Sequence, residues 1–339
     1  MSILLAVVVI GALIFVHELG HFLAARAAGI RVHEFALGMG PILLSRVKGH
    51  TRYSLRAIPI GGFLRVAGEE GEESEIPEAE RYDKKPIRVK ALFVAGGAFM
   101  NFALAIVIFI LIFTFMGVPS TQPVLGAVSP GSPAEAAGLL PGDRVLYVGE
   151  DAIASWTDMQ QAVAKYPGRE VIFVVDRGGA EQSLAVTPRL DETLNRALVG
   201  VQASYEKFNI LHAVFLGVRE TIWFTAEIVL VIVRMITGAV PAEGAGPIGI
   251  VVMVGEVART GLVNLLSFAA VISIQLGLFN LLPIPALDGS KLAFLSLEAI
   301  RGKPVDPEWE NMIHLLGFAL LMGFLVLITF KDLQRLNIF

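Results

Sequence analysis

Two histidines and a glutamate lie inside an apolar run near the start of the chain. The run reads LLAVVVIGALIFVHELGHFLAARAAGI, and His17, Glu18 and His21 form its His-Glu-x-x-His pattern. Residues four apart share one face of a helix, so the two imidazoles can hold one metal ion with Glu18 beside them. Ionisable groups inside an apolar span are costly and are explained first by function. The pattern therefore predicts a metal site.

A third metal ligand has to come from elsewhere in the chain. A catalytic zinc usually has three protein ligands and a water, and the chain has no cysteine. The segment NLLPIPALDGS, Asn280 to Ser290, closes an apolar run with two prolines and then supplies Asp288. A proline break at membrane depth is tolerated where it is buried or lines a wet cavity. Asp288 is therefore the best third ligand, and a plain Asp-Gly turn at a helix end is the alternative.

The composition is that of a membrane protein. The chain has 339 residues, 55% of them hydrophobic, and a mean hydropathy of +0.68, which is too apolar for an ordinary soluble protein. The net charge is −4 and no basic stretch interleaves with aromatic residues, so a nucleic-acid partner is not expected. Without cysteine, disulfides, thiolate metal sites and cysteine nucleophiles are excluded.

Apolar runs long enough to cross a bilayer recur along the chain. Four candidate spans cover roughly Ile3 to Ala28, Ala91 to Gly117, Leu262 to Leu282 and Met312 to Phe330. A fifth stretch, residues 210–238, carries internal charges and is predicted to be interfacial or re-entrant rather than spanning.

Charge predicts how the chain lies in the membrane. Residues 26–90 hold twelve Lys or Arg, which by the positive-inside rule places this loop in the cytoplasm and the N-terminus outside. His17 lies ~20 Å along the helix from Ile3, so the active site is expected toward the cytoplasmic side.

Two polar regions between the spans are β-prone. Residues 31–68 alternate β-prone runs with glycine turns and predict a hairpin, for which a plain loop is the alternative. A strand edge at Val32 to Leu37 or Leu55 to Ile60 is expected to hold an unwound substrate segment.

The insert of residues 121–205 resembles a PDZ domain of the bacterial protease type, notably in SPAEAAGLLPGDRVLYVGE. Its Val124 to Val128 would line a peptide groove; the alternative is a cover that binds nothing.

Taken together, HELGH, NLLPIPALDG and the PDZ-like insert between pairs of spans resemble the site-2 protease family of intramembrane zinc metalloproteases, in its bacterial form that cleaves membrane-anchored anti-sigma factors. The resemblance covers almost the whole chain. It implies one zinc ion, Glu18 as general base, and Asn280 as a residue that helps to hold the substrate strand. It implies zinc ligation by His17, His21 and Asp288. The motifs LGMGP and GGFLRV add Gly38, Gly40, Gly61 and Gly62 to the substrate-binding candidates.

The expected fold is a polytopic α-helical membrane protein with about four transmembrane helices, a membrane-associated β-hairpin loop and an inserted PDZ-like domain. Residues 1–120 would form the first half of the protease core, 121–205 the PDZ-like domain outside the cytoplasm, and 206–339 the second half. The resemblance further implies a bacterial inner-membrane location and membrane-anchored protein substrates that another protease has already shortened. The PDZ-like domain would then act as a size filter.

Two other function classes fit parts of the pattern. A membrane adaptor would bind peptides through its PDZ-like domain and keep a non-catalytic metal site. A metal transporter would repeat its intramembrane polar groups along several spans, whereas here they converge on one site. Glu18 discriminates against the adaptor, which has no use for a base beside a metal.

Overall fold

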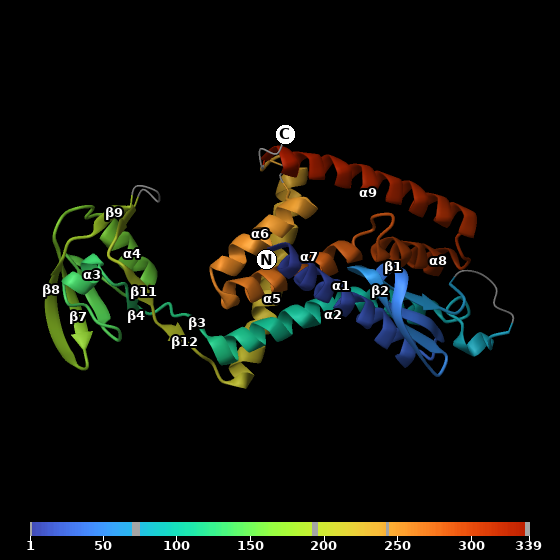
Figure 1. Cartoon of the computed structure of the whole chain (residues 1–339), viewed down its shortest axis with the longest axis horizontal. Coiled ribbons are helices and arrows are strands. Elements are labelled where there is room, and N and C mark those ends of the chain that lie inside the picture. The colour runs from blue at the N-terminus through green and yellow to red at the C-terminus, as the bar shows by residue number, and fades with distance from the viewer. Residues whose placement is uncertain (1, 70–74, 192–195, 242–243, 336–339) are drawn as a thin grey trace. The chain divides into compact units, whose positions relative to one another are not determined.

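The computed structural model describes residues 2–69, 75–191, 196–241 and 244–335, which fall into two compact units (Figure 1). One unit comprises Met1–Ile110 and Val214–Phe339, and the other comprises Leu111–Ala213.

The first unit is mainly helical. Its helices are α1 (Ser2–Ala27), α2 (Ile87–Leu111), α5 (Ile210–Ile236), α6 (Pro247–Arg259), α7 (Leu262–Leu281), α8 (Asp288–Arg301) and α9 (Pro307–Arg335). Within the described residues, four helical stretches are long and apolar enough to cross a membrane: Ile3–Ala27, Ile87–Met116, Leu262–Leu281 and Glu308–Arg335. They confirm the four candidate spans, and the charged helix α5 is not among them.

Glycines bring α1 and α2 into close contact. A Cβ atom on Gly20 would overlap the carbonyl oxygen of Gly96, and one on Gly96 would lie 2.9 Å from the carbonyl oxygen of Gly20. Both distances are shorter than van der Waals contact, so the two backbones touch at this crossing. The adjoining core joins α1, α2, α8 and the hairpin through Ala25, Ile30, Val32, Val66, Phe93, Val94 and Leu295.

The hairpin strands β1 (Val32–Lys48) and β2 (Thr51–Val66) fold back on themselves. Residues 34–37 of β1 have two sets of partners, residues 62–65 and residues 52–55 of β2, while residues 44–48 pair with 51–55. Residues 34–37 therefore lie between two neighbours and offer no free edge. Leu55 is also paired twice, with Leu37 and Leu44. We expected a substrate-binding edge at Val32 to Leu37 or Leu55 to Ile60. This is wrong for residues 34–37 and for Leu55, which are paired on both sides, whereas Val32, Arg56 and Ile58 each have one pairing partner. The outer segments of the folded hairpin are 62–66 and 42–48.

The connection from α7 to α8 is short and strained. Helix α7 ends at Leu281, and Pro283 and Pro285 prevent its continuation. Ala286 has a φ of 73°, a left-handed conformation that costs an L-residue about 1 kcal/mol or more. On α9, Gly317 leaves room for Pro285, since its Cβ atom would overlap the proline ring. This packing fixes where α8, and Asp288 at its first position, begins.

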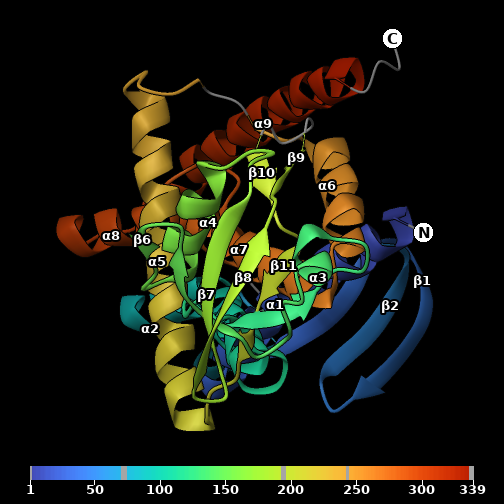
Figure 2. The same cartoon turned by 90° about the vertical axis from the view of Figure 1, so that its left-hand side faces the viewer.

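The second unit is β-rich, and its strands are in view in Figure 2. Strands β5 (Arg144–Val148), β6 (Asp151–Ala152), β7 (Val171–Arg177) and β8 (Ala180–Val186) form a sheet in the order β6-β5-β7-β8. Further short strands are β3 (Val118–Pro119), β4 (Leu125–Val128), β9 (Arg189–Asp191), β10 (Arg196–Leu198), β11 (Val201–Ala203) and β12 (Tyr205–Glu206). They pair as β4 with β11, β9 with β10, and β3 with β12.

Two capped helices complete this unit. Helix α3 (Pro133–Ala136) is capped by the Ser132 hydroxyl, and α4 (Trp156–Ala164) begins with a capping box of Ser155 and Asp158. Both pack on a core that includes the fully buried Phe173, Val145 and Val175. The β-rich insert expected from the sequence is confirmed.

Candidate metal centre

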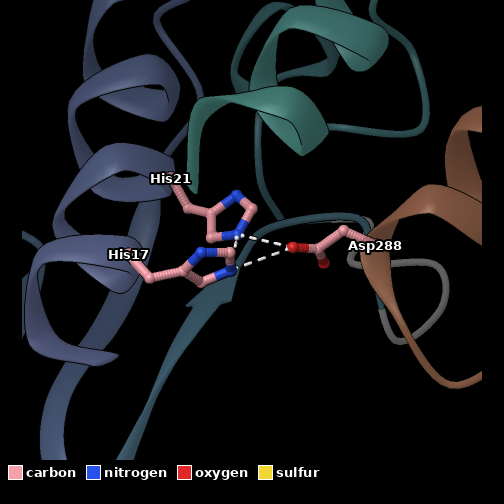
Figure 3. Close-up of side chains that lie close together, drawn as sticks. All are labelled: His17, His21 and Asp288. Atoms are coloured by element: carbon pink, nitrogen blue, oxygen red, sulfur yellow. Dashed lines mark hydrogen bonds and ion pairs between the residues drawn. The ribbon is translucent and has the colours of Figure 1, made fainter. Parts of the chain in front are cut away.

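Three predicted ligands meet at one point (Figure 3). His17 and His21 lie one turn apart on α1, and Asp288 approaches from the start of α8. Oδ2 of Asp288 is 3.0 Å from Nε2 of His17 and 3.1 Å from Nε2 of His21, and the two Nε2 atoms are 3.2 Å apart. Both histidines are buried, so residues 267 or more positions apart converge inside the protein.

The spacing of these atoms fits a zinc ion. Bonds of about 2.0–2.2 Å in a tetrahedron place neighbouring ligand atoms about 3.3 Å apart. The three observed separations of 3.0–3.2 Å are close to that value, and two imidazoles with one carboxylate are a donor set that zinc accepts. Within the described residues, this is the group of His, Asp and Glu side chains that could hold a metal ion.

Helix α2 orients both imidazoles. Nδ1 of His21 is 3.0 Å from the backbone carbonyl oxygen of Phe93, which can only accept a hydrogen bond. Nδ1 therefore carries a proton, and in the neutral imidazole that a metal ion requires, Nε2 has the lone pair that binds the metal. The side-chain amide of Asn101 lies 3.1 Å from Nδ1 of His17.

Gly97 lies on α2 between these two contacts. A Cβ atom on Gly97 would be 2.7 Å from Nε2 of His17 and closer still to Nε2 of His21. Such distances are well inside van der Waals contact. The histidine pair can pack against α2 only because residue 97 has no side chain.

Glu18 and the three predicted ligands line a cavity with a volume of about 360 Å³. A Cβ atom on Gly62 would lie 3.0 Å from Cγ of Glu18 and 2.9 Å from the carbonyl oxygen of Ala36. The glycine of β2 thus leaves the space in which the glutamate side chain lies.

Other side chains from distant parts of the chain complete the cavity wall. Asn280, near the end of α7, lines the cavity, as do Phe63 and Leu64 of β2. Lys291 and Glu69 also line it, and their side chains form an ion pair at 2.6 Å. The cavity that contains the Asp288 carboxylate is therefore lined by residues of helices, of strand β2 and of one ion pair.

The predicted glycines fall into two groups. Gly62 begins the outer segment of β2 and Gly61 directly precedes it; a Cβ atom would contact Met39 at Gly61 and Glu18 at Gly62. Gly38 and Gly40 of β1 pack near Ile58 instead. None of the four glycines is among the described residues that line the cavity; Gly62 contacts Glu18, which does.

Two residues of this centre are not among those predicted from the sequence. Gly97 and Asn101 are four apart on α2 and both contact His17. An asparagine in a strongly apolar helix is itself a signal, since polar groups inside a span are costly. The sequence could therefore have indicated a role for Asn101, but its contact with His17 is known only from the fold.

Comparison with known proteins agrees with the site. The family model "Peptidase family M50" matches residues 5–324. The chain is 34% identical to the zinc metalloprotease RasP of Geobacillus kaustophilus, with 98% of each chain covered. It is 33% identical to the regulator of sigma-W protease RasP of Bacillus subtilis, covering 99% of each, and 36% identical to a putative zinc metalloprotease of Clostridium perfringens, covering 98% of each.

A solved structure is similar to part of the chain only. The PDZ domain of an SdrC-like protein from Listeria monocytogenes matches 25% of this chain and 90% of its own length, with 17% identity and a TM-score of 0.22. That score carries no argument about the fold, whereas the family model and the relatives span nearly the whole chain. The chain therefore belongs to peptidase family M50, and it is a zinc metalloprotease.

Proposed function

We propose that the chain hydrolyses a peptide bond within or near the transmembrane segment of membrane-anchored proteins such as anti-sigma factors, in regulated intramembrane proteolysis. The observation that carries this proposal is the meeting of His17, His21 and Asp288 beside Glu18. The two histidines and Glu18 lie on α1, which is apolar enough to span a membrane, and Asp288 follows the end of α7, another such helix. Relatives that match nearly the whole chain are named zinc metalloproteases, and one is named a regulator of sigma-W protease.

Each residue of the site has a proposed role. His17, His21 and Asp288 hold one zinc ion, which supplies the Lewis acidity that activates water and polarises the scissile carbonyl. Glu18 accepts the proton of the attacking water and then donates it to the leaving amine nitrogen. Asn280, on the cavity wall, supplies a side-chain amide that hydrogen-bonds the substrate backbone.

A transmembrane substrate has to unwind before it can be cut, because a helix holds its carbonyls in internal hydrogen bonds. The outer segment of β2, residues 62–66, pairs with β1 on one side and carries Phe63 and Leu64 in the cavity wall. We place the unwound substrate along this segment by main-chain pairing. Gly61 and Gly62 keep its approach free of side chains, and Gly38 and Gly40 would act further along the hairpin.

The orientation follows from charge. The loop of residues 26–90 with its twelve Lys or Arg lies in the cytoplasm of a bacterial cell, and the active site faces that side of the inner membrane. The domain of residues 121–205 then lies outside, between core halves 1–120 and 206–339. There it would admit substrates that another protease has already shortened.

The first experiment measures zinc per protein in mild detergent, for the wild type and for Asp288→Ala. We expect about one zinc in the wild type and loss of most of it in the variant, because two imidazoles alone bind zinc weakly. Glu256→Ala, which removes an exposed carboxylate on α6, is the control and keeps its zinc. A wild type without zinc, or an Asp288→Ala protein that retains it, would refute the ligand set.

Activity separates the protease from the membrane adaptor. Glu18→Gln keeps the shape of the side chain and removes the base, so we expect it to bind zinc and to cleave no membrane-anchored anti-sigma factor in reconstituted vesicles. The adaptor hypothesis predicts no cleavage by the wild type either. The relatives do not favour that alternative.

A further inference from the structure

Asn101 is a polar residue without an assigned role on the strongly apolar helix α2. It is fully buried on α2, and its side-chain amide nitrogen lies 3.1 Å from Nδ1 of His17. The amide oxygen, also buried, has no hydrogen-bond partner among the described residues. The contact with His17 is therefore the only one that sets the orientation of this amide within the described structure.

The chemistry of a histidine ligand decides which end of the amide is needed. In a zinc site, Nε2 of His17 must present its lone pair, because it faces Asp288 and His21. A neutral imidazole then carries its proton on Nδ1 and needs an acceptor there. Of the two ends of an amide, only the oxygen accepts.

The Asn101 amide can turn its oxygen toward Nδ1 of His17 without losing another hydrogen bond. Its oxygen and nitrogen are nearly equivalent in shape, and a half-turn about the Cβ–Cγ bond exchanges them. Because the oxygen has no partner in its present position, this turn breaks no other described hydrogen bond. The backbone of the residue is held separately, as the Ser273 hydroxyl donates to the Asn101 carbonyl oxygen at 2.8 Å.

We propose that Asn101 is a positioning residue of the metal centre, whose side-chain oxygen accepts the Nδ1 proton of His17 and so fixes Nε2 as the ligand atom. The inference rests on the proposed zinc site. It gives α2 a defined role in that site, because the Phe93 carbonyl orients His21, Gly97 admits the pair, and Asn101 orients His17. The three residues of α2 are spaced four apart and lie on one face of the helix.

The test measures zinc affinity of the full-length protein in detergent by competition with a chromophoric chelator. Asn101→Leu keeps the approximate size and removes the acceptor, and we expect zinc affinity to fall 10- to 100-fold, as is typical for a lost partner of a ligating histidine. Asn101→Asp retains an oxygen acceptor and should bind zinc about as tightly as the wild type. Ser273→Ala removes the neighbouring buried hydrogen bond without touching the amide, and should also retain its affinity.

Histidine tautomers give a second readout that a purely structural role would not move. In ¹⁵N-histidine spectra of the zinc-loaded wild type, His17 should carry its proton on Nδ1, and Asn101→Leu should remove the hydrogen-bonded shift of that proton. Unchanged affinity in Asn101→Leu would overturn the proposal. So would an Asn101→Asp protein that folds and loses zinc.

The outcomes also separate this proposal from the proposed function. A wild type that binds no zinc refutes the metal site itself, whereas zinc binding that is indifferent to Asn101→Leu refutes only the role of Asn101. Thermal unfolding in excess chelator shows whether Asn101→Leu folds. If it does not, the zinc affinity of Asn101→Asp tests the proposal, which requires an affinity close to that of the wild type.

Discussion

At the scale of single residues, the metal centre depends as much on an absent side chain as on the ligands. Gly97 faces both histidines, and any Cβ atom there would enter the space of Nε2 of His17 and His21. Gly62 does the same for Glu18. These glycines are required by close approach, so their replacement should act on the site directly rather than through helix propensity.

We expect Gly97→Ala to bind zinc at least tenfold more weakly than the wild type. The added methyl group has to displace the imidazoles by several tenths of an ångström, and misplaced ligands lose affinity by such factors. Isothermal titration with zinc measures this. Gly323→Ala on α9 is the matched control, because a Cβ atom there would contact nothing within 4 Å; equal losses in both variants would contradict the prediction.

At the scale of elements, the two histidines and Asp288 are positioned in different ways. Helices α1 and α2 touch through Gly20 and Gly96, and Asp288 is placed by the proline break before α8. The β-rich unit instead depends on a polar anchor. There the buried Asp143 carboxylate accepts hydrogen bonds from Arg177 at 2.7 Å and from the Leu140 N–H at 2.9 Å.

This anchor makes the stability of the β-rich unit depend on pH. Burial raises the pKa of the Asp143 carboxyl, but the hydrogen bonds from Arg177 and Leu140 outweigh it and hold the pKa below its usual range. A lowered pKa adds stability that is fully present above the unfolded value of about 4 and is lost as the pH falls through the folded value. The unit should therefore weaken in acid.

We expect Arg177→Met to lower the melting temperature of the β-rich unit at pH 7, and the deficit relative to wild type to shrink as the pH falls below about 4. Trp156 fluorescence, with the tryptophans at 223 and 309 replaced by Phe, follows this unit. Lys165→Met is the control, since its ion pair with Asp151 is exposed and should contribute little. A deficit that stays constant down to pH 3 would exclude the Asp143 carboxylate as its cause.

At the scale of the whole molecule, the number of membrane crossings is set by α5. Within the described residues, four helices are long and apolar enough to span, and α5 is not among them. His17 on α1 and Asp288 at the start of α8 meet, so the end of α7 that leads to Asp288 has to lie at the depth of His17. With α7 running from outside to inside, this holds only if α5 stays on the outer side.

Cysteine labelling tests this topology on a chain that has no cysteine of its own. Cysteines at Phe208 and at Ala239 flank α5, and we expect an impermeant maleimide to label both from the outer side. Ser45→Cys in the hairpin serves as the cytoplasmic control and should be labelled only after the membrane is opened. Labelling of Phe208→Cys and Ala239→Cys from opposite sides would mean that α5 spans the membrane.

Features that depend on the spacing of nearby residues could be predicted from the sequence. The four-residue step from His17 to His21 defines a helix face, and long apolar runs define spans, because both follow from the geometry of one helix. Asp288 was found because ionisable groups near a span are few, and Pro283 and Pro285 mark where its helix must break. The β-rich character of the insert followed from its strand and turn residues.

Contacts between segments that are distant in the sequence became known from the three-dimensional structure. The sequence does not record that α2 packs on α1 so that Gly97 and Asn101 face His17, some 80 positions away. Nor does it record that the hairpin folds back, which puts residues 34–37 between two neighbouring segments and Gly62 beside Glu18. Local patterns fix the face of an element, but the partner of that face is set by packing across the whole fold.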